Sequence, residues 1–387
     1  MRASSNHWLQ PLRSAYEEPW LVAERLRSQG TRVVGVLGWS VPRELIVAAG
    51  LAPVRLSARR LYNKNPIDEI GACRADDRLA RLAAVLSPPT AAVLQALLDG
   101  SLGWLDALVI GRDNESHTRL FYILRELAAQ GERLLPFAFF DLLRLPYRTS
   151  AIYNRRQARE LLCELQGWSG RVADAGRLAW ADAQQRELQS ALGRLASLRG
   201  RVPAALSGSA MLTVAGAAQV LPGEELLEML APAQTHDVCG DAGGGPRVFV
   251  SGSGLDDLWF YRVLEDVGVN VVGEDHEWGP AALGQPSAAA DPLDSIVDRY
   301  HYAPGGAARA GLSERVALTA LRARSLHADA VLHIAFAHDE APKWECAELQ
   351  ALLGDMPLLR VQLPYWERRP QMLLDAIAPI LEGPSDG

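Results

Sequence analysis

The segment GEDHEWG holds the densest group of side chains capable of acid–base or metal chemistry. Its members are Glu274, Asp275, His276 and Glu277, and they follow the apolar run at 269–272. That order is typical of a buried strand that ends in polar residues. Carboxylates beside an imidazole could bind a hard metal ion or tune a general base. Acids at strand ends also commonly cap helices, so a structural role stays open.

Thiol chemistry is a second possibility. The four cysteines are Cys73, Cys163, Cys239 and Cys346. No two of them have the close spacing of the ligand pairs in zinc sites or bacterial ferredoxins, which argues against both kinds of site. Four separate reduced thiols are what an ordinary cytosolic protein carries.

Two further segments could bind phosphate. The densest basic series consists of Arg55, Arg59, Arg60, Lys64, Arg74, Arg78 and Arg81. Guanidinium groups suit phosphate oxygens, although neighbouring acids also allow a solvated helix face. Val248–Gly254 (VFVSGSG) runs into a glycine–serine turn that could cradle a phosphate. The third glycine of a dinucleotide fingerprint is missing, so an ordinary turn bordering an inter-domain cleft is the expected structure.

Composition places these residues in a globular protein. At 387 residues the chain is too long for one comfortable core. Its 49% hydrophobic and 22% charged residues, with a net charge of −7, describe a surface that would not favour nucleic acid. No apolar run reaches the roughly 18 residues of a membrane span, and the N-terminal segment lacks the apolar core of a signal peptide. We expect a cytoplasmic protein with no nucleic-acid or membrane partner.

The elements that must position these residues alternate between strands and helices. Strands are predicted at 33–37, 52–56, 105–110 and 134–140, and helices before about 29 and at 43–49, 75–86, 88–98 and 118–130. Residues 151–200 are predicted to be almost wholly helical, followed by a short helix (GAAQVL or EELLEML) and a glycine-rich linker within 234–246. A second series has strands near 247–250, 269–272, 329–335 and 358–363, with a helix at 255–267.

This alternation favours parallel strands joined by crossover helices. We therefore expect an α/β fold with two Rossmann-like domains, each built on a short, mostly parallel sheet. The expected boundaries are 1–150 for the first domain, 151–245 for a helical connecting region and linker, and 246–387 for the second domain.

The order of motifs along nearly the whole chain resembles a known family. The matching segments are Val33–Leu56 (VVGVLGWSVPRELIVAAGLAPVRL), Ser87–Gly100 (SPPTAAVLQALLDG), Trp104–Ile110 (WLDALVI), Asn114–Leu120 (NESHTRL), Val269–Asp275 (VNVVGED), Asp291–Leu293, Arg299–Tyr300 and Ala328–Phe336 (ADAVLHIAF). The series resembles the 2-hydroxyacyl-CoA dehydratase and benzoyl-CoA reductase subunit family, of the 2-hydroxyglutaryl-CoA dehydratase D-component type.

The resemblance implies that this chain has lost the family's iron–sulfur site. In the family, three thiolates of each subunit hold a 4Fe–4S cluster, and here the corresponding positions carry Ser87, Asn114 and Ala337. Hydroxyl, amide and methyl groups do not replace thiolates as iron ligands. We therefore predict no cofactor. A cluster displaced onto Cys73 and Cys346, which lie near two of the family's ligand positions, is the alternative.

The resemblance also places the candidate binding site in the inter-domain cleft. His117 and His338 flank the emptied ligand positions and could hydrogen-bond a ligand or coordinate a metal; satisfied buried histidines are the alternative. Trp39 and Ser40 reverse the family's order of a small residue followed by an aromatic one, which predicts a reshaped pocket. The candidate cleft residues are Trp39, Ser40, Ser87, Asn114, His117, Ala337 and His338, and no catalytic residue is assigned.

The function implied by the resemblance is that of a subunit. Family members form heterodimers in which an activator supplies one electron and the cluster passes it to an acyl-CoA thioester, as a lyase or a reductase. The chain would then be a cluster-free subunit that pairs with a cluster-bearing homologue, or with itself, and acts on an acyl-CoA. A stand-alone non-radical enzyme, an acyl-thioester-binding protein, and a scaffold or regulatory module are the alternatives.

Overall fold

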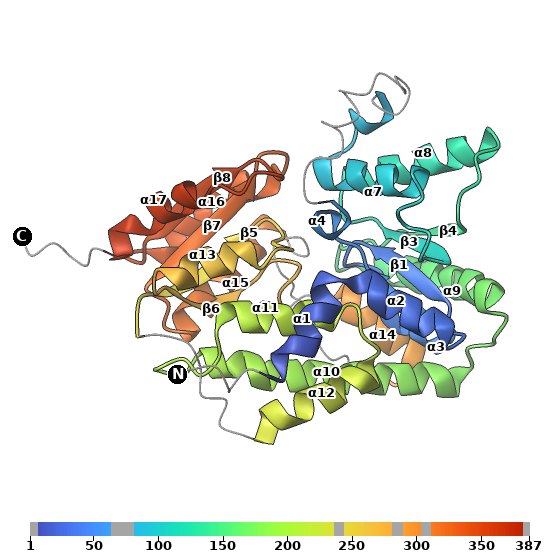
Figure 1. The fold of residues 1–387 in the computed structure, drawn as a ribbon, viewed down its shortest axis with the longest axis horizontal. Helices are drawn as coiled ribbons and strands as arrows, with labels where there is room; N and C mark the ends of the chain where they lie inside the picture. The colour runs from blue at the N-terminus through green and yellow to red at the C-terminus, as the bar shows by residue number, and fades with distance from the viewer. Residues whose placement is uncertain (1–6, 63–80, 236–243, 281–288, 303–310, 382–387) are drawn as a thin grey trace, which may run out of the picture.

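Two four-stranded sheets form the centre of the described structure (Figure 1). The computed structural model describes residues 7–62, 81–235, 244–280, 289–302 and 311–381. All strand pairs in both sheets are parallel. The strand orders are β2-β1-β3-β4 and β6-β5-β7-β8, so the two sheets share one topology. The predicted α/β fold with two Rossmann-like units is confirmed.

The first unit follows the predicted pattern closely. Its strands are β1 (Val33–Leu37), β2 (Ala52–Arg55), β3 (Ala107–Gly111) and β4 (Phe137–Phe140). Its helices are α1 (Leu9–Glu17), α2 (Pro19–Ser28), α3 (Arg43–Ala48), α4 (Ala58–Leu61), α7 (Pro88–Leu98) and α8 (Glu115–Ala129). Strands β1 and β3 are buried at every position, as expected for parallel strands covered on both faces. Most of the helix predicted at 75–86 lies outside the described residues.

The second unit begins with β5 (Arg247–Gly252) and repeats the arrangement. Its other strands are β6 (Asn270–Glu274), β7 (Ala330–Phe336) and β8 (Leu358–Leu363), and its helices are α13 (Trp259–Asp266), α15 (Leu312–Ser325), α16 (Ala341–Leu353) and α17 (Pro370–Leu381). The helix predicted at 255–267 is shorter at its start. No helix among the described residues combines the length and apolarity needed to cross a bilayer.

Four helices lie in the part of the chain between β4, the last strand of the first sheet, and β5, the first strand of the second. They are α9 (Arg148–Ser169), α10 (Ala175–Arg199), α11 (Gly208–Ala217) and α12 (Gly223–Thr235). The predicted break between the two long helices occurs at Gly170, which caps α9 with a φ of +69°. The short helix predicted at EELLEML is confirmed as part of α12, whereas α11, which ends where GAAQVL begins, was not predicted. Most of the predicted linker at 234–246 lies outside the described residues.

Two helices connect the units. The long helix α10 contacts α3 of the first unit and β6 of the second (Figure 1). Helix α14 (Pro292–His301) comes from the second half of the chain but packs on α9 and α10. Its Leu293, Ile296, Val297 and Tyr300 share one apolar cluster with residues of β1, β3 and α3. The chain therefore returns to the first unit after it has begun the second.

A buried ion cluster fixes α14 in this position. Arg299 forms ion pairs with Glu44 of α3 and Asp182 of α10, and the three side chains are 0%, 1% and 6% exposed. The hydroxyl of Tyr300 donates to Glu44 at 2.8 Å, and that of Ser295 donates to Asp182 at 3.0 Å. We call Arg299, Glu44 and Asp182 the α14 ion cluster. Because each charge has partners, the cluster tolerates burial that would otherwise be costly.

Candidate functional site

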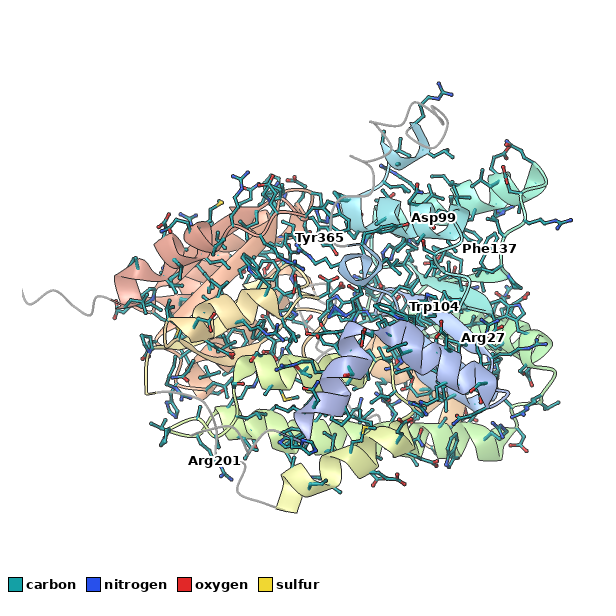
Figure 2. The ribbon with its side chains drawn as sticks, viewed as in Figure 1. Arg27, Asp99, Trp104, Phe137, Arg201 and Tyr365 are labelled. Atoms are coloured by element: carbon teal, nitrogen blue, oxygen red, sulfur yellow. The ribbon has the colours of Figure 1, made fainter. Side chains whose placement is uncertain are left out.

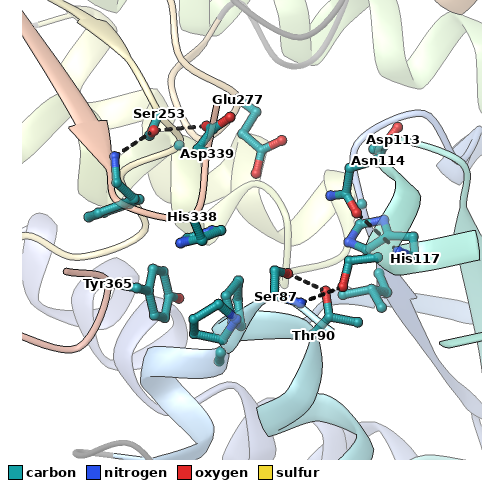
Figure 3. Close-up of a pocket in the computed structure, with 18 of the residues that line it drawn as sticks. Ser87, Thr90, Asp113, Asn114, His117, Ser253, Glu277, His338, Asp339 and Tyr365 are labelled. Carbon is teal, nitrogen blue, oxygen red and sulfur yellow. Dashed lines mark hydrogen bonds between the residues drawn. The ribbon is translucent and has the colours of Figure 1, made fainter. Parts of the chain in front are cut away.

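A cavity of about 750 Å³ lies between the two units. It is lined by the turns at the carboxyl ends of β1, β2 and β3 in one unit and of β5, β6 and β7 in the other (Figure 3). In each sheet the order of the strands changes direction at one point, between β1 and β3 in the first sheet and between β5 and β7 in the second. Ligands of open α/β sheets bind at such points. Here two of these points face the same cavity. Its volume suits a small-molecule ligand.

The structure brings four of the seven candidate cleft residues together. Ser87, Asn114, His117 and His338 line the cavity. Ala337 is exposed between the lining residues Phe336 and His338, and its backbone N–H donates to Leu363 at 2.9 Å. Trp39 and Ser40 are buried behind the wall. What roles these seven residues have in binding stays a prediction.

Trp39 and Ser40 support the cavity wall from behind. The backbone N–H of Trp39 donates to Asp113 at 2.6 Å, and the guanidinium of Arg144 lies 4.6 Å from the centre of the Trp39 ring. Both Asp113 and Arg144 line the cavity. Ser40 is fully buried, and a Cβ added to Gly111 would lie 2.5 Å from its hydroxyl oxygen. The turn thus shapes the pocket through its neighbours.

The start of α7 offers few free N–H groups. The N–H of Ser87 donates to the Ser116 hydroxyl at 2.7 Å, and Pro88 and Pro89 have no N–H to donate. The hydroxyls of Ser87 and Thr90 share a hydrogen bond of 2.9 Å. At this end of the helix, two residues therefore lack an N–H and a third N–H is taken by a side chain of α8.

The start of α8 is capped by Asn114 and holds a neutral histidine. The Asn114 side chain accepts from the N–H of His117 at 3.0 Å. Nδ1 of His117 lies 2.9 Å from the carbonyl oxygen of Gly111, which can only accept, so Nδ1 carries the proton. Burial lowers the pKa of His117, although Asp113 opposes the shift. The other ring nitrogen is thus a hydrogen-bond acceptor at the cavity wall.

His338 belongs to an aromatic group on the opposite wall. Its ring stacks on Phe336, with 5.9 Å between centroids, and meets the edge of Tyr365 at 5.7 Å. Burial lowers the pKa of His338. Tyr365 lies on the side of the second unit that faces α4 and α7 (Figure 2) and donates to Asp256 at 3.1 Å. Both histidines therefore enter the cavity as neutral side chains.

Arg55 and Arg59 of the basic series form buried contacts instead of the solvated face considered from the sequence, and whether the series binds phosphate stays a prediction. Arg55 and Arg59 are buried. Arg59 pairs with Asp256 at 3.5 Å and Asp257 at 3.6 Å, and its guanidinium lies 4.5 Å from the centre of the Tyr365 ring. These arginines tie the first unit to the second. Lys64, Arg74 and Arg78 lie outside the described residues.

The turn at Val248–Gly254 is an ordinary strand end. Gly252 has a φ of +107°, and the N–H of Ser253 is taken by the carbonyl of Ile334 at 2.8 Å. The Ser253 hydroxyl donates to Asp339 at 2.8 Å and accepts from the N–H of Phe336 at 3.0 Å. The turn borders the cavity, as expected, but the donors of Ser253 bind β7 and the loop that follows it.

His276 is part of a buried structural network and does not line the cavity. Nδ1 of His276 accepts from the N–H of Trp278 at 3.2 Å, so the proton resides on Nε2, which lies 2.8 Å from the Tyr261 oxygen. Tyr261 donates onward to Glu274 at 3.2 Å, and Arg199 pairs with Glu274. Within the described residues no group of three or more acids, histidines or cysteines could hold a metal ion.

This network predicts a loss of stability in mild acid. Burial lowers the pKa of His276 from its ordinary 6.5 to about 4. Between these values the unfolded chain binds a proton that the folded chain does not, so stability falls as the pH falls, by up to about 1.4 kcal/mol per pH unit. Urea unfolding at several pH values should show a steeper loss for the wild type than for His276→Gln. Parallel curves would contradict the assignment.

The sequence reasoning missed several lining residues. Asp113, Arg144, Asp339 and Tyr365 all face the cavity. Asp113 and Asp339 each follow a predicted strand within a few residues, and polar residues just beyond the carboxyl ends of parallel strands are the ones expected at such a site. That signal was present in the sequence.

The cysteines that the structure describes do not line the cavity. Cys163 is exposed on α9, and Cys346 is half-buried on α16, where its thiol lies 3.4 Å from the carbonyl oxygen of Pro342. Cys73 and Cys239 lie outside the described residues. The alternative in which Cys73 and Cys346 hold a displaced cluster therefore stays a prediction.

Two comparisons with known proteins bear on the identity of the chain. No curated protein matches the chain significantly. A sequence model of the family described as 2-hydroxyglutaryl-CoA dehydratase, D-component, matches residues 38–380. The match covers nearly the whole chain, from the turn after β1 to the last helix. The chain therefore belongs to the 2-hydroxyglutaryl-CoA dehydratase D-component family.

Proposed function

We propose that the protein is a cluster-free subunit of a 2-hydroxyacyl-CoA dehydratase-type complex. In this proposal it pairs with a homologue that carries the iron–sulfur cluster, and its own cleft receives an acyl-CoA thioester. The observation that supports it best is the cavity of about 750 Å³, where two sheet switch points meet. The cavity persists although the residues at the family's ligand positions lack thiols.

The chemistry of the described lining residues does not fit a 4Fe–4S cluster. Ser87 and Asn114 bring a hydroxyl and an amide to the wall, and both already bond within their own helix starts. Iron–sulfur clusters are held by thiolates, and no thiol stands among the described lining residues. We therefore assign this chain no electron-transfer step and place the cluster on the partner.

The cavity wall does fit a polar ligand with an apolar part. Arg119, Arg144 and Arg315 contribute guanidinium groups that can donate hydrogen bonds, and Trp278, Phe336 and Tyr365 contribute aromatic surface. A mixture of apolar surface with a few convergent polar groups is typical of small-molecule sites. An acyl thioester has a carbonyl oxygen that can accept a hydrogen bond from the wall and an acyl chain that can pack on its aromatic surface.

Anaerobic co-purification from native extract tests the pairing. Tagged full-length chain should bring down a homologous subunit, and iron and acid-labile sulfide should follow that subunit after the two are separated. Stoichiometric iron and sulfide on the isolated chain would overturn the cluster-free assignment. Their disappearance in Cys73→Ser with Cys346→Ser would identify those thiols as the ligands.

Titration with an acyl-CoA such as butyryl-CoA tests the ligand site. His338→Ala removes a side chain from the wall and is expected to weaken binding by roughly tenfold, about the value of one lost contact. His7→Ala, an exposed position outside the cavity, is the matched control and should not change the affinity. Equal affinities in the three proteins would show that His338 does not contact the ligand, and no binding by the wild type would contradict an acyl-thioester site.

A further inference from the structure

Glu277 is a carboxylate held in place from two units. Arg55, at the end of β2, pairs with one of its side-chain oxygens at 3.2 Å and donates to its backbone carbonyl at 2.7 Å. The Arg55 guanidinium also lies 4.0 Å from the centre of the Trp278 ring. The second carboxylate oxygen of Glu277 has no partner within the described part of the chain. The side chain is 33% exposed and lines the cavity.

A glycine makes room for this carboxylate. A Cβ added to Gly254 would lie 2.6 Å from Cγ and 2.8 Å from Oε1 of Glu277. Such distances are too short for any real contact, so a side chain at 254 would displace the carboxylate. The turn after β5 and Arg55 together fix one orientation of Glu277. A side chain that transfers a proton must be held in one orientation toward its substrate, and these contacts hold Glu277 in that way.

The surroundings of Glu277 also make its carboxylate a stronger base than an ordinary glutamate. Burial raises its pKa, Arg55 lowers it, and the facing carboxylates of Asp113, Asp339 and Asp256 raise it further. A base is most effective when its pKa lies near the working pH. Figure 3 shows Glu277 beside Asp339 on one wall, with Asn114 and His117 on the other.

The opposite wall offers hydrogen-bond donors. Asn114 caps only the N–H of His117. The first N–H groups of a helix have no acceptor inside it, and Glu115 and Ser116, which begin α8, both line the cavity. Helix N-termini favour negative charge. An oxygen that becomes negative during a reaction would be stabilised at this wall.

From this layout we infer a proton-transfer activity: Glu277 is the general base that removes the α-proton of an acyl thioester bound in the cleft. The inference rests on the proposed acyl-thioester site. The C–H bond at the α-carbon breaks and an O–H bond forms on the free carboxylate oxygen of Glu277. The electron pair stays on the thioester as an enolate, with its oxygen toward the start of α8. The reverse step returns the proton, so no oxidant, reductant or co-reactant is consumed.

Deuterium exchange tests this activity without a partner or an electron donor. Full-length protein is incubated with butyryl-CoA in D2O, and deuterium at the α-carbon is followed by mass spectrometry. The wild type should exchange faster than buffer, and Glu277→Gln should lower the rate by at least about 100-fold, the value of a positioned base. Gly254→Ala, which displaces the carboxylate, should also slow the exchange. Glu340→Gln, an exposed neighbour outside the cavity lining, should exchange like the wild type.

Binding of butyryl-CoA, measured in the same proteins, separates the possible failures. If the wild type binds butyryl-CoA but does not exchange its α-proton, the role of Glu277 is overturned and the ligand site stands. If Glu277→Gln exchanges at the wild-type rate, another group is the base and the inference is wrong. If the wild type binds no acyl-CoA, both the ligand site and the inference fail.

Discussion

Replacing Arg299 with Leu is expected to lower the free energy of unfolding by about 3–5 kcal/mol, the usual cost of removing one partner from a buried ion pair. Arg299 is fully buried between Glu44 and Asp182. Without it, Glu44 remains buried beneath α14 with no ion-pair partner, and Asp182 keeps only the half-exposed Arg186. Chemical denaturation followed by circular dichroism measures the change.

Arg186 provides a control that shares a carboxylate with Arg299. It also pairs with Asp182, but its side chain is 43% exposed. Because exposed ion pairs contribute little, Arg186→Ala should cost less than about 1 kcal/mol. Equal losses in the two variants would show that burial does not set the energy of the α14 ion cluster.

The second large effect is expected at the contact between the units. Arg59→Met should lower the free energy of unfolding by about 3–5 kcal/mol, because it leaves Asp256 with a buried, unpaired charge. The side chains of Arg59 and Asp256 are each 3% exposed. Part of the loss comes from the aromatic rings of Phe260, Phe336 and Tyr365, over which the guanidinium lies.

Arg368 is the matched control for this contact. It pairs with Asp257 at 2.7 Å, as Arg59 does on the other side, but it is 43% exposed. Arg368→Ala should change the free energy of unfolding by less than about 1 kcal/mol. A loss as large as that of Arg59→Met would mean that Asp257, rather than the buried Asp256, dominates the contact.

Most of the fold could be predicted from the sequence, because the strands are short apolar runs bounded by glycine or proline. The ranges predicted for β1, α7 and β8 agree with the structure. Helix α11 could not be located in this way. It is buried at nine of its ten positions, so it has no polar face and no helical period in its apolar residues.

The candidate site was only partly predictable for a similar reason. Ser87 and Asn114 were identified from motif order, and both line the cavity. Trp39 is just as close in sequence to a strand end, yet it turns inward beneath Arg144. The direction of a side chain at a turn depends on contacts with distant residues, such as Asp113. Local pattern carries no information about those contacts.

The position of α14 has a consequence for how this architecture can be divided. Residues 292–301 follow β6 in the chain but complete the packing around α3, α9 and α10. A genetic exchange that replaced everything after the first unit would carry this helix away and uncover the apolar surface that it protects. The two units share one strand order, but they cannot be separated at a single point of the chain, because α14 of the second half packs on the first unit. An exchange of whole units would therefore have to keep residues 292–301 with the first unit.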